Sequence, residues 1–252
     1  MSKQNRVVFI SGASRGIGLA MVKAFLNAGN KVAFFDVNEP DINEIPAEQR
    51  DRIMFEILDV TDTKACAAYA QRVKEKWGNI GILCNNAGIS PKNAAGVSNV
   101  LLDLTEEEWF KVININLTSA VFLTKAILPQ MIEAGWGRIV NMHSLAGRAR
   151  STITGTSYCC SKGALGAFTR VIANEYGPAG ITSNAIAPGR ITSPMADQLG
   201  AEKNAAMAKL IPVQRYGTAA EVADVAVFLA AESSGFLNGM VVDINGGAYM
   251  PA

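Results

Sequence analysis

Two side chains suited to proton transfer, Tyr158 and Lys162, stand four residues apart, and Ser144 precedes them by a short segment. At positions i and i+4 of a helix, a phenol and an ammonium lie on one face. A tyrosine titrates at about pH 10, and a nearby positive charge favours the phenolate, so Lys162 is expected to lower the pKa of Tyr158. Tyr-x-x-x-Lys also occurs on ordinary helix surfaces. Ser144, at the end of a predicted strand, is the feature that favours a general acid/base site.

A glycine-rich turn near the N-terminus, Gly12-Ala-Ser-Arg-Gly16-Ile-Gly18, points to a phosphate-bearing ligand. Gly12 permits a tight turn, and Gly16 and Gly18 allow close approach of the backbone to a pyrophosphate and close helix packing. A helix that begins at Ile17 presents free N–H groups and a partial positive charge to an anion. A glycine pattern alone is weak evidence, but this one lies in the required strand–turn–helix context.

The elements that position these residues alternate between short apolar segments and helical patterns. The predicted strands lack polar alternation, as do strands covered on both faces. They span Arg6–Ser11, Lys31–Asp36, Ile53–Ile57, Ile80–Cys84, Arg138–Met142, Ile181–Ala187 and Met240–Ile244. The predicted helices span Ile17–Asn27, Thr63–Trp77, Glu106–Ala134, Ser157–Tyr176 and Ala219–Ala231.

This alternation predicts a doubly wound α/β Rossmann fold, with about seven parallel strands, helices on both faces and right-handed crossovers. No linker or second domain is visible. Residues 1–252 are therefore expected to form a single dinucleotide-binding and catalytic domain. The substrate is expected over the carboxyl ends of the strands, where such sheets bind ligands.

Composition excludes several classes of function. The chain of 252 residues has 23 Lys and Arg against 22 Asp and Glu, a net charge of +1, which favours neither nucleic acid nor an acidic membrane surface. No signal-like apolar segment opens the sequence and no run of about 18 apolar residues occurs, so a cytoplasmic protein is expected. The four cysteines lack metal-ligand spacing and are read as reduced thiols.

Asp36 ends the second predicted strand, 18 residues after Gly18. A carboxylate at that place accepts both ribose hydroxyls of NAD and repels the 2′-phosphate of NADP. Asp36 therefore favours NAD. Arg15 in the glycine turn offers a compensating positive charge, which keeps NADP as the weaker alternative. Asp36 could also have no cofactor role and simply start a turn.

The spacing Gly-x-x-x-Gly-x-Gly resembles that of the short-chain dehydrogenase/reductase family, which includes 3-oxoacyl carrier-protein reductases and polyol and alcohol dehydrogenases. The resemblance covers nearly the whole chain through five motifs at predicted strand ends. They are the glycine turn, Asp59-Val60, Asn85-Asn86-Ala87-Gly88, Tyr158-x-x-x-Lys162 and Pro188-Gly189.

The resemblance implies that Asp59 and Val60 contact the adenine, that Asn86 to Gly88 lie along the adenosine ribose, and that the Ile191 backbone meets the carboxamide. The family often has threonine where this chain has Ser193, and Thr192 is the alternative. The full expected set of cofactor contacts is Gly12, Ser14, Arg15, Gly16, Ile17, Gly18, Asp36, Asp59, Val60, Asn86, Ala87, Gly88, Tyr158, Lys162, Pro188, Gly189, Ile191 and Ser193.

The resemblance also implies the catalytic roles. Ser144 hydrogen-bonds the substrate oxygen, Tyr158 acts as general acid/base, and Lys162 also holds the nicotinamide ribose. Asn116 matches the asparagine that supports a water-linked proton relay, while Asn114 is read as a polar helix position. A homotetramer is implied, built from the two long helices and the C-terminal segment.

Two other chemistries are disfavoured. The only histidine, His143, precedes Ser144, and neighbouring residues of a strand point to opposite faces, so it is poorly placed as the base of that serine. Clustered Cys and His ligands for a catalytic zinc are missing, which predicts a metal-free reaction.

These residues predict an oxidoreductase that transfers a hydride reversibly between NAD(H) and a small secondary alcohol or ketone. Two alternatives stay open: an NADPH-linked 3-oxoacyl carrier-protein reductase and a non-catalytic protein that binds NAD. Arg148, Arg150 and Arg190 flank the same cleft. They either clamp an acidic substrate or are solvated or interface charges, paired with acids such as Glu175.

Overall fold

The computed structural model describes residues 5–94, 96–149, 153–192 and 201–251. Within them, seven strands form one parallel sheet in the order β3-β2-β1-β4-β5-β6-β7, which confirms the predicted fold class. The strands are β1 Val7–Ser11, β2 Lys31–Asp36, β3 Ile53–Ile57, β4 Ile80–Asn85, β5 Gly137–Met142, β6 Ile181–Pro188 and β7 Val241–Ile244.

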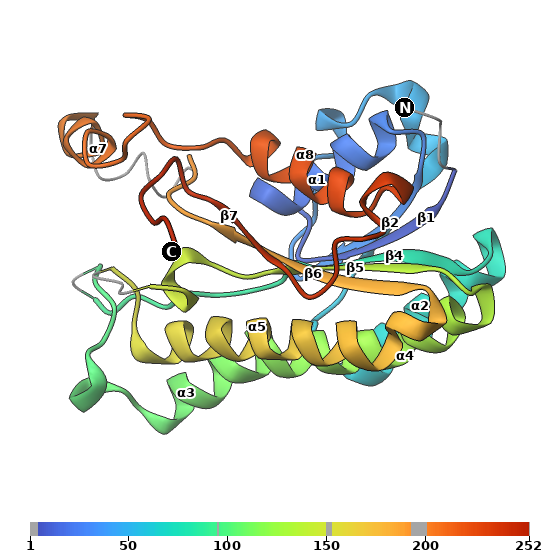
Figure 1. Cartoon of the computed structure of the whole chain (residues 1–252), viewed down its shortest axis with the longest axis horizontal. Coiled ribbons are helices and arrows are strands. Elements are labelled where there is room, and N and C mark those ends of the chain that lie inside the picture. The colour runs from blue at the N-terminus through green and yellow to red at the C-terminus, as the bar shows by residue number, and fades with distance from the viewer. Residues whose placement is uncertain (1–4, 95, 150–152, 193–200, 252) are drawn as a thin grey trace.

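Helices cover both faces of this sheet (Figure 1). On one face lie α1 and α8, which pack against each other, and on the other lie α2, α4 and α5. The α-helices are α1 Gly16–Asn27, α2 Thr63–Trp77, α3 Glu106–Ile113, α4 Ser119–Ala134, α5 Thr156–Tyr176, α7 Ala201–Ala208 and α8 Ala219–Leu229. Of these, α7 is not predicted from the sequence.

The residues of β1 show why the strands lack polar alternation. Val8 and Ile10 pack into the core that contains α1 and α8. Val7 and Phe9 point the other way, into the core that contains Tyr69 of α2. Because successive side chains of a strand face opposite sides and both sides are covered, every position of β1 is buried.

The order of the strands places the ligand crevice. The chain runs outward from β1 to β2 and β3, then crosses back so that β4 pairs with the other side of β1. At such a reversal the loops after the two central strands diverge and leave a crevice above their carboxyl ends. The glycine turn follows β1, and Asn86 to Gly88 follow β4, so both border this crevice.

The segment predicted as one helix over Glu106–Ala134 is continuous but irregular. A single π turn, η4 Asn114–Thr118, separates α3 from α4 and contains Asn116. A π turn holds one residue more than an α-helical turn needs and often marks a functional position.

This 29-residue run has a mean hydropathy of 1.4 over its most apolar window, long and apolar enough to cross a membrane by composition alone. Its C-terminal part, α4, packs against β4, β5 and α2. The apolar residues Leu123, Ile127 and Met131 of α4 lie in the sheet's core. Core packing therefore accounts for the apolar composition.

Candidate active site

A cleft of about 730 Å³ runs along the carboxyl ends of the central strands. Residues of the glycine turn and of the loops after β2, β3, β4, β5 and β6 line it, together with α5. The sequence-predicted residues in its lining are Gly12, Arg15, Gly16, Ile17, Gly18, Asp36, Asp59, Val60, Asn86, Ala87, Gly88, Ser144, Tyr158, Lys162, Pro188, Gly189 and Ile191. The structure thus brings together residues that lie far apart in the sequence.

The glycine turn has the backbone that glycine permits. Gly12 has a φ of +66°, and a Cβ there would lie 2.7 Å from the Cα of Ala87. A Cβ on Gly18 would lie 2.3 Å from the carbonyl oxygen of Gly12. Neither position accepts a side chain without moving backbone, because real Cβ atoms essentially never come within 3.0 Å of a neighbour.

Polar contacts from the end of β4 hold the turn in place. The Asn86 side-chain amide donates to the carbonyl oxygens of Ser11 and Gly12, at 3.1 and 2.6 Å. The Ser11 hydroxyl oxygen accepts from the backbone N–H groups of Asn86 and Ala87. Asn86 therefore braces the cofactor turn, a structural role in addition to the ribose contact that the family resemblance implies.

Asp36 lies at the end of β2 beside this turn. One carboxylate oxygen accepts from the Ser14 backbone N–H at 3.1 Å, and the other from the Asn38 backbone at 3.0 Å. The side chain is half-buried and lines the cleft, so the carboxylate is oriented by the backbone and still faces the ligand.

The residues around the turn fit a dinucleotide. Ser14 is buried, and its hydroxyl has no hydrogen-bond partner within the described parts of the chain. The N-terminus of α1 begins at Gly16 beside it, where no side chain caps the free N–H groups. An unpartnered buried hydroxyl and an open helix N-terminus both suit a diphosphate.

Ser144 and Tyr158 meet at the other end of the cleft. The Ser144 hydroxyl accepts from the Ala146 backbone at 3.2 Å and hydrogen-bonds the Tyr158 side chain. Desolvation raises the pKa of Tyr158, and the bond to Ser144 offsets this only in part. The expected lowering of the Tyr158 pKa by Lys162 is wrong for the protein on its own.

The position of Lys162 explains why it does not lower the pKa of Tyr158. Its Nζ lies 5.7 Å from the centroid of the Tyr158 ring and donates to the backbone oxygen of Met142 at 2.7 Å. Burial lowers the pKa of Lys162 to about 8. A buried ammonium that is directed to a carbonyl stabilises a phenolate less than one facing the phenol oxygen, so it does not offset the desolvation that raises the pKa of Tyr158.

Asn116 joins the loop after β4 to α5. Its side-chain amide donates to the Ile89 carbonyl and to the Ser161 hydroxyl, both at 3.0 Å, and its Oδ1 accepts from the Ile89 backbone at 2.8 Å. A Cβ on Gly88 would lie 3.2 Å from Lys162 Nζ and 3.4 Å from Asn116 Oδ1. The absence of a side chain on Gly88 thus leaves room for both Asn116 and Lys162.

His143 is buried and its Nδ1 lies 2.7 Å from the carbonyl oxygen of Ser144, which makes Nδ1 the donor. Burial lowers the pKa of His143 to about 4, so the ring is neutral. Its hydrogen bond is with the backbone of Ser144, and β5 ends at Met142, so His143 follows the strand and does not belong to it. In the described parts of the chain, no three His, Cys, Asp or Glu side chains cluster as metal ligands.

Comparisons with known proteins identify the family of this chain. The family model described as "Enoyl-(Acyl carrier protein) reductase" matches residues 12–249. The 3-oxoacyl-[acyl-carrier-protein] reductase FabG of Pseudomonas aeruginosa is 37% identical over 99% of this chain and 100% of the relative. The chain belongs to the short-chain dehydrogenase/reductase family.

Two crystal structures from Brucella melitensis support the same assignment for this short-chain dehydrogenase/reductase. Both are named 3-oxoacyl-[acyl-carrier protein] reductases, and one contains bound NAD. Each is 38% identical, with TM-scores of 0.91 and 0.88. The matches cover 99% and 98% of this chain, and 93% and 92% of theirs. The protein is therefore an oxidoreductase of this family that uses a nicotinamide dinucleotide.

Some predicted positions of this short-chain dehydrogenase/reductase fall elsewhere. Ser193 and Arg150 lie outside the described residues, and Thr192, the alternative to Ser193, lines the cleft. Arg148 is paired with Asp243, at 2.8 Å between Nη2 and Oδ2, so a structural ion pair describes it better than a substrate clamp. This pairing lies within one chain, so it differs from the solvated or subunit-interface charge that the sequence offered as the alternative.

Sequence reasoning missed several groups that hold the candidate site together. They are the Ser11 hydroxyl, the Met142 carbonyl, Ser161 and the pair of Arg148 with Asp243. A backbone carbonyl leaves no trace in a residue pattern. Ser11 does carry a signal, because it is a polar residue at the end of an otherwise apolar strand directly before the glycine turn.

Proposed function

We propose that the protein reduces the ketone of a 3-oxoacyl thioester to a hydroxyl group with NADH. The sequence alone favoured a general NAD-linked secondary alcohol dehydrogenase and kept the 3-oxoacyl reductase as the alternative. The names of the relatives support that alternative for the substrate. The carboxylate of Asp36 at the cleft end supports NAD(H) for the cofactor, as does the bound NAD of one relative.

The observation that carries the proposal is the Tyr158 phenol beside the Ser144 hydroxyl, at the end of the cleft that begins at the glycine turn. NADH, when bound in this cleft, would supply a hydride to the carbonyl carbon. Tyr158 donates its proton to the carbonyl oxygen, and Ser144 hydrogen-bonds the same oxygen. Desolvation keeps the Tyr158 pKa high, which holds the phenol in the protonated form that a proton donor needs. Lys162 binds the nicotinamide ribose, and Asn116 supports the water-linked proton relay.

The proposal includes one domain over residues 1–252 and a cytoplasmic homotetramer. Exposed apolar side chains support the assembly. Phe122 of α4 and Val171 of α5 are 44% and 49% exposed, on the helices expected to form one interface. Phe236 and Met240, beside β7, are also exposed and suit a second. All four cysteines are free thiols, as expected in a reducing compartment.

The experiment compares acetoacetyl thioester with NADH or NADPH against a panel of polyols, sugars and hydroxy acids with NAD⁺, followed by nicotinamide absorbance. Reduction of the thioester with NADH as the better cofactor is the expected result, and Tyr158→Phe is the inactive control. Turnover of the panel without the thioester would return the function to a general alcohol dehydrogenase. NADH binding without any turnover would favour the non-catalytic alternative.

A further inference from the structure

The turn that carries Ser144 is one 3₁₀ turn, η5 Leu145–Gly147, fixed at both ends. Ser144 caps its start, and Arg148 follows its last residue. Backbone bonds from Gly147 to Ser144 and from Arg148 to Leu145, at 3.0 and 2.9 Å, close the turn. Any shift of Arg148 is therefore passed through a single hydrogen-bonded turn to Ser144.

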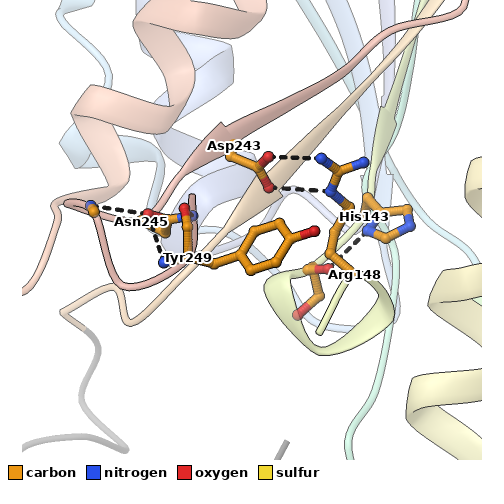
Figure 2. A network of polar contacts seen from close by, with 7 residues as sticks. His143, Arg148, Asp243, Asn245 and Tyr249 are labelled. Atoms are coloured by element: carbon orange, nitrogen blue, oxygen red, sulfur yellow. Dashed lines mark hydrogen bonds and ion pairs between the residues drawn. The ribbon is translucent and has the colours of Figure 1, made fainter. Parts of the chain in front are cut away.

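Arg148 is held by a forked ion pair. Its Nη2 lies 2.8 Å from one oxygen of Asp243, and its Nε lies 3.3 Å from the other (Figure 2). The two side chains are 25% and 15% exposed. Every other ion pair among the described residues has both side chains at least 33% exposed. A bidentate, mostly buried pair is more directional and less screened than a surface pair.

The far side of this pair is fixed to the sheet and to the C-terminal segment. Asp243 lies in β7, in register with Ala187 of β6. The ring of Tyr249 lies 5.6 Å from the Arg148 guanidinium carbon, within cation–π range. Asn245 fixes Tyr249, because its Nδ2 donates to the Tyr249 carbonyl at 3.0 Å, as Figure 2 shows.

We propose that Arg148, Asp243 and Tyr249 are positioning residues that set the direction of the Ser144 hydroxyl. None of the three lines the cleft, so they act through the η5 turn and not on the substrate. This inference rests on the proposed role of Ser144 in ketone reduction. It assigns to the last strand and the C-terminal segment a part in the chemistry that the five sequence motifs do not contain.

The test is a double-mutant cycle between Asp243→Asn and Ser144→Ala, read as kcat and KM for acetoacetyl thioester and Kd for NADH. Asp243→Asn is expected to lower kcat about 10-fold with Kd for NADH unchanged, since small misplacements of catalytic groups cost up to about 10²-fold. In the Ser144→Ala background the same change is expected to cost less than about 2-fold, because its target is already gone.

A matched control, Glu232→Gln, breaks the exposed pair with Arg6 and is expected to leave kcat unchanged. Tyr249→Phe keeps the ring and should resemble the wild type, whereas Tyr249→Ala should lower kcat. If Asp243→Asn does not fold, the cycle is run with Tyr249→Ala, which leaves no buried charge unpaired.

Equal losses in the wild-type and Ser144→Ala backgrounds, or no loss in kcat at all, would overturn the positioning role. Full activity of Ser144→Ala alone would instead refute the role of Ser144 in the proposed function. The two failures are therefore distinguishable.

Discussion

Replacing Asp36 by asparagine is expected to invert the cofactor preference. The substitution removes one negative charge from the cleft and keeps the size of the side chain. The backbone N–H groups of Ser14 and Asn38 now fix the carboxylate at 3.1 and 3.0 Å. An amide has a single acceptor oxygen, so it retains only one of these contacts and cannot accept from both ribose hydroxyls.

The size of the effect follows from the charges. Two unit charges about 5 Å apart repel by about 1–3 kcal/mol at effective dielectric constants of about 80 to 20. A 2′-phosphate carries about −1.5 to −2 charges, and Asp36 is half-buried. Repulsion by the Asp36 carboxylate should therefore weaken NADPH binding by about 2–3 kcal/mol, or about 30- to 150-fold. In the variant, NADH loses hydrogen bonds from its ribose to a charged acceptor, which weakens its binding by about 1.5–3 kcal/mol. The NADH/NADPH ratio of kcat/KM should therefore fall at least about 10²-fold.

The assay measures kcat/KM for both cofactors at one fixed concentration of acetoacetyl thioester, at low and high salt. Salt should reduce the discrimination against NADPH in the wild type and have less effect on the variant. Asp51→Asn is the matched control, because it removes one exposed carboxylate outside the cleft. Wild-type preference for NADPH, or an unchanged ratio in Asp36→Asn, would refute the reasoning.

Three further changes test the rest of the site. Tyr158→Phe should lower kcat about 10²- to 10⁴-fold with Kd for NADH retained, by stopped-flow kinetics and titration. Lys162→Met should abolish turnover yet stabilise the cofactor-free protein by about 2–3 kcal/mol at pH 7, because burial depresses the lysine pKa to about 8. That gain should shrink above pH 8, where the folded wild type releases the proton while the unfolded chain keeps it, and a constant gain in denaturant titrations up to pH 10 would contradict it. Gly18→Ala should weaken NADH binding at least about 10-fold, since its Cβ would lie 2.3 Å from the Gly12 oxygen, whereas Gly163→Ala, with its nearest neighbour at 3.8 Å, should bind normally.

The sequence predicted the fold well, because strands and helices leave local patterns, and the structure brings most of the predicted site residues to one cleft. The bounds of β2, β3 and α2 agree with the predicted ranges, since apolar strands and a capped helix have sharp ends in composition. The sequence pattern Thr218-x-x-Glu221 predicts a capping box at the start of α8, and both of its hydrogen bonds are present.

Prediction failed where distant partners compete for a side chain. The sequence pattern Thr105-x-x-Glu108 predicts a capping box at the start of α3. Only half of it forms, because the Glu108 carboxylate accepts from Ser157 and Asn99 instead. The pKa of Tyr158 was predicted from its spacing to Lys162 alone. Desolvation instead raises this pKa, and the Lys162 ammonium donates to the Met142 carbonyl; neither burial nor that carbonyl appears in a one-dimensional pattern.

The π turn at Asn114–Thr118 has a consequence for attempts to make this protein more heat-resistant. An α-helix advances about 100° per residue, so removing the additional residue would rotate α3 by about 100° relative to α4. Glu108 would then leave Ser157, which it now meets at 3.1 Å. Asn116 would no longer reach both Ile89 and Ser161. Replacing the π turn by a regular α-helix to gain heat resistance would therefore cost activity. Thermostabilising designs should keep the length of this segment fixed.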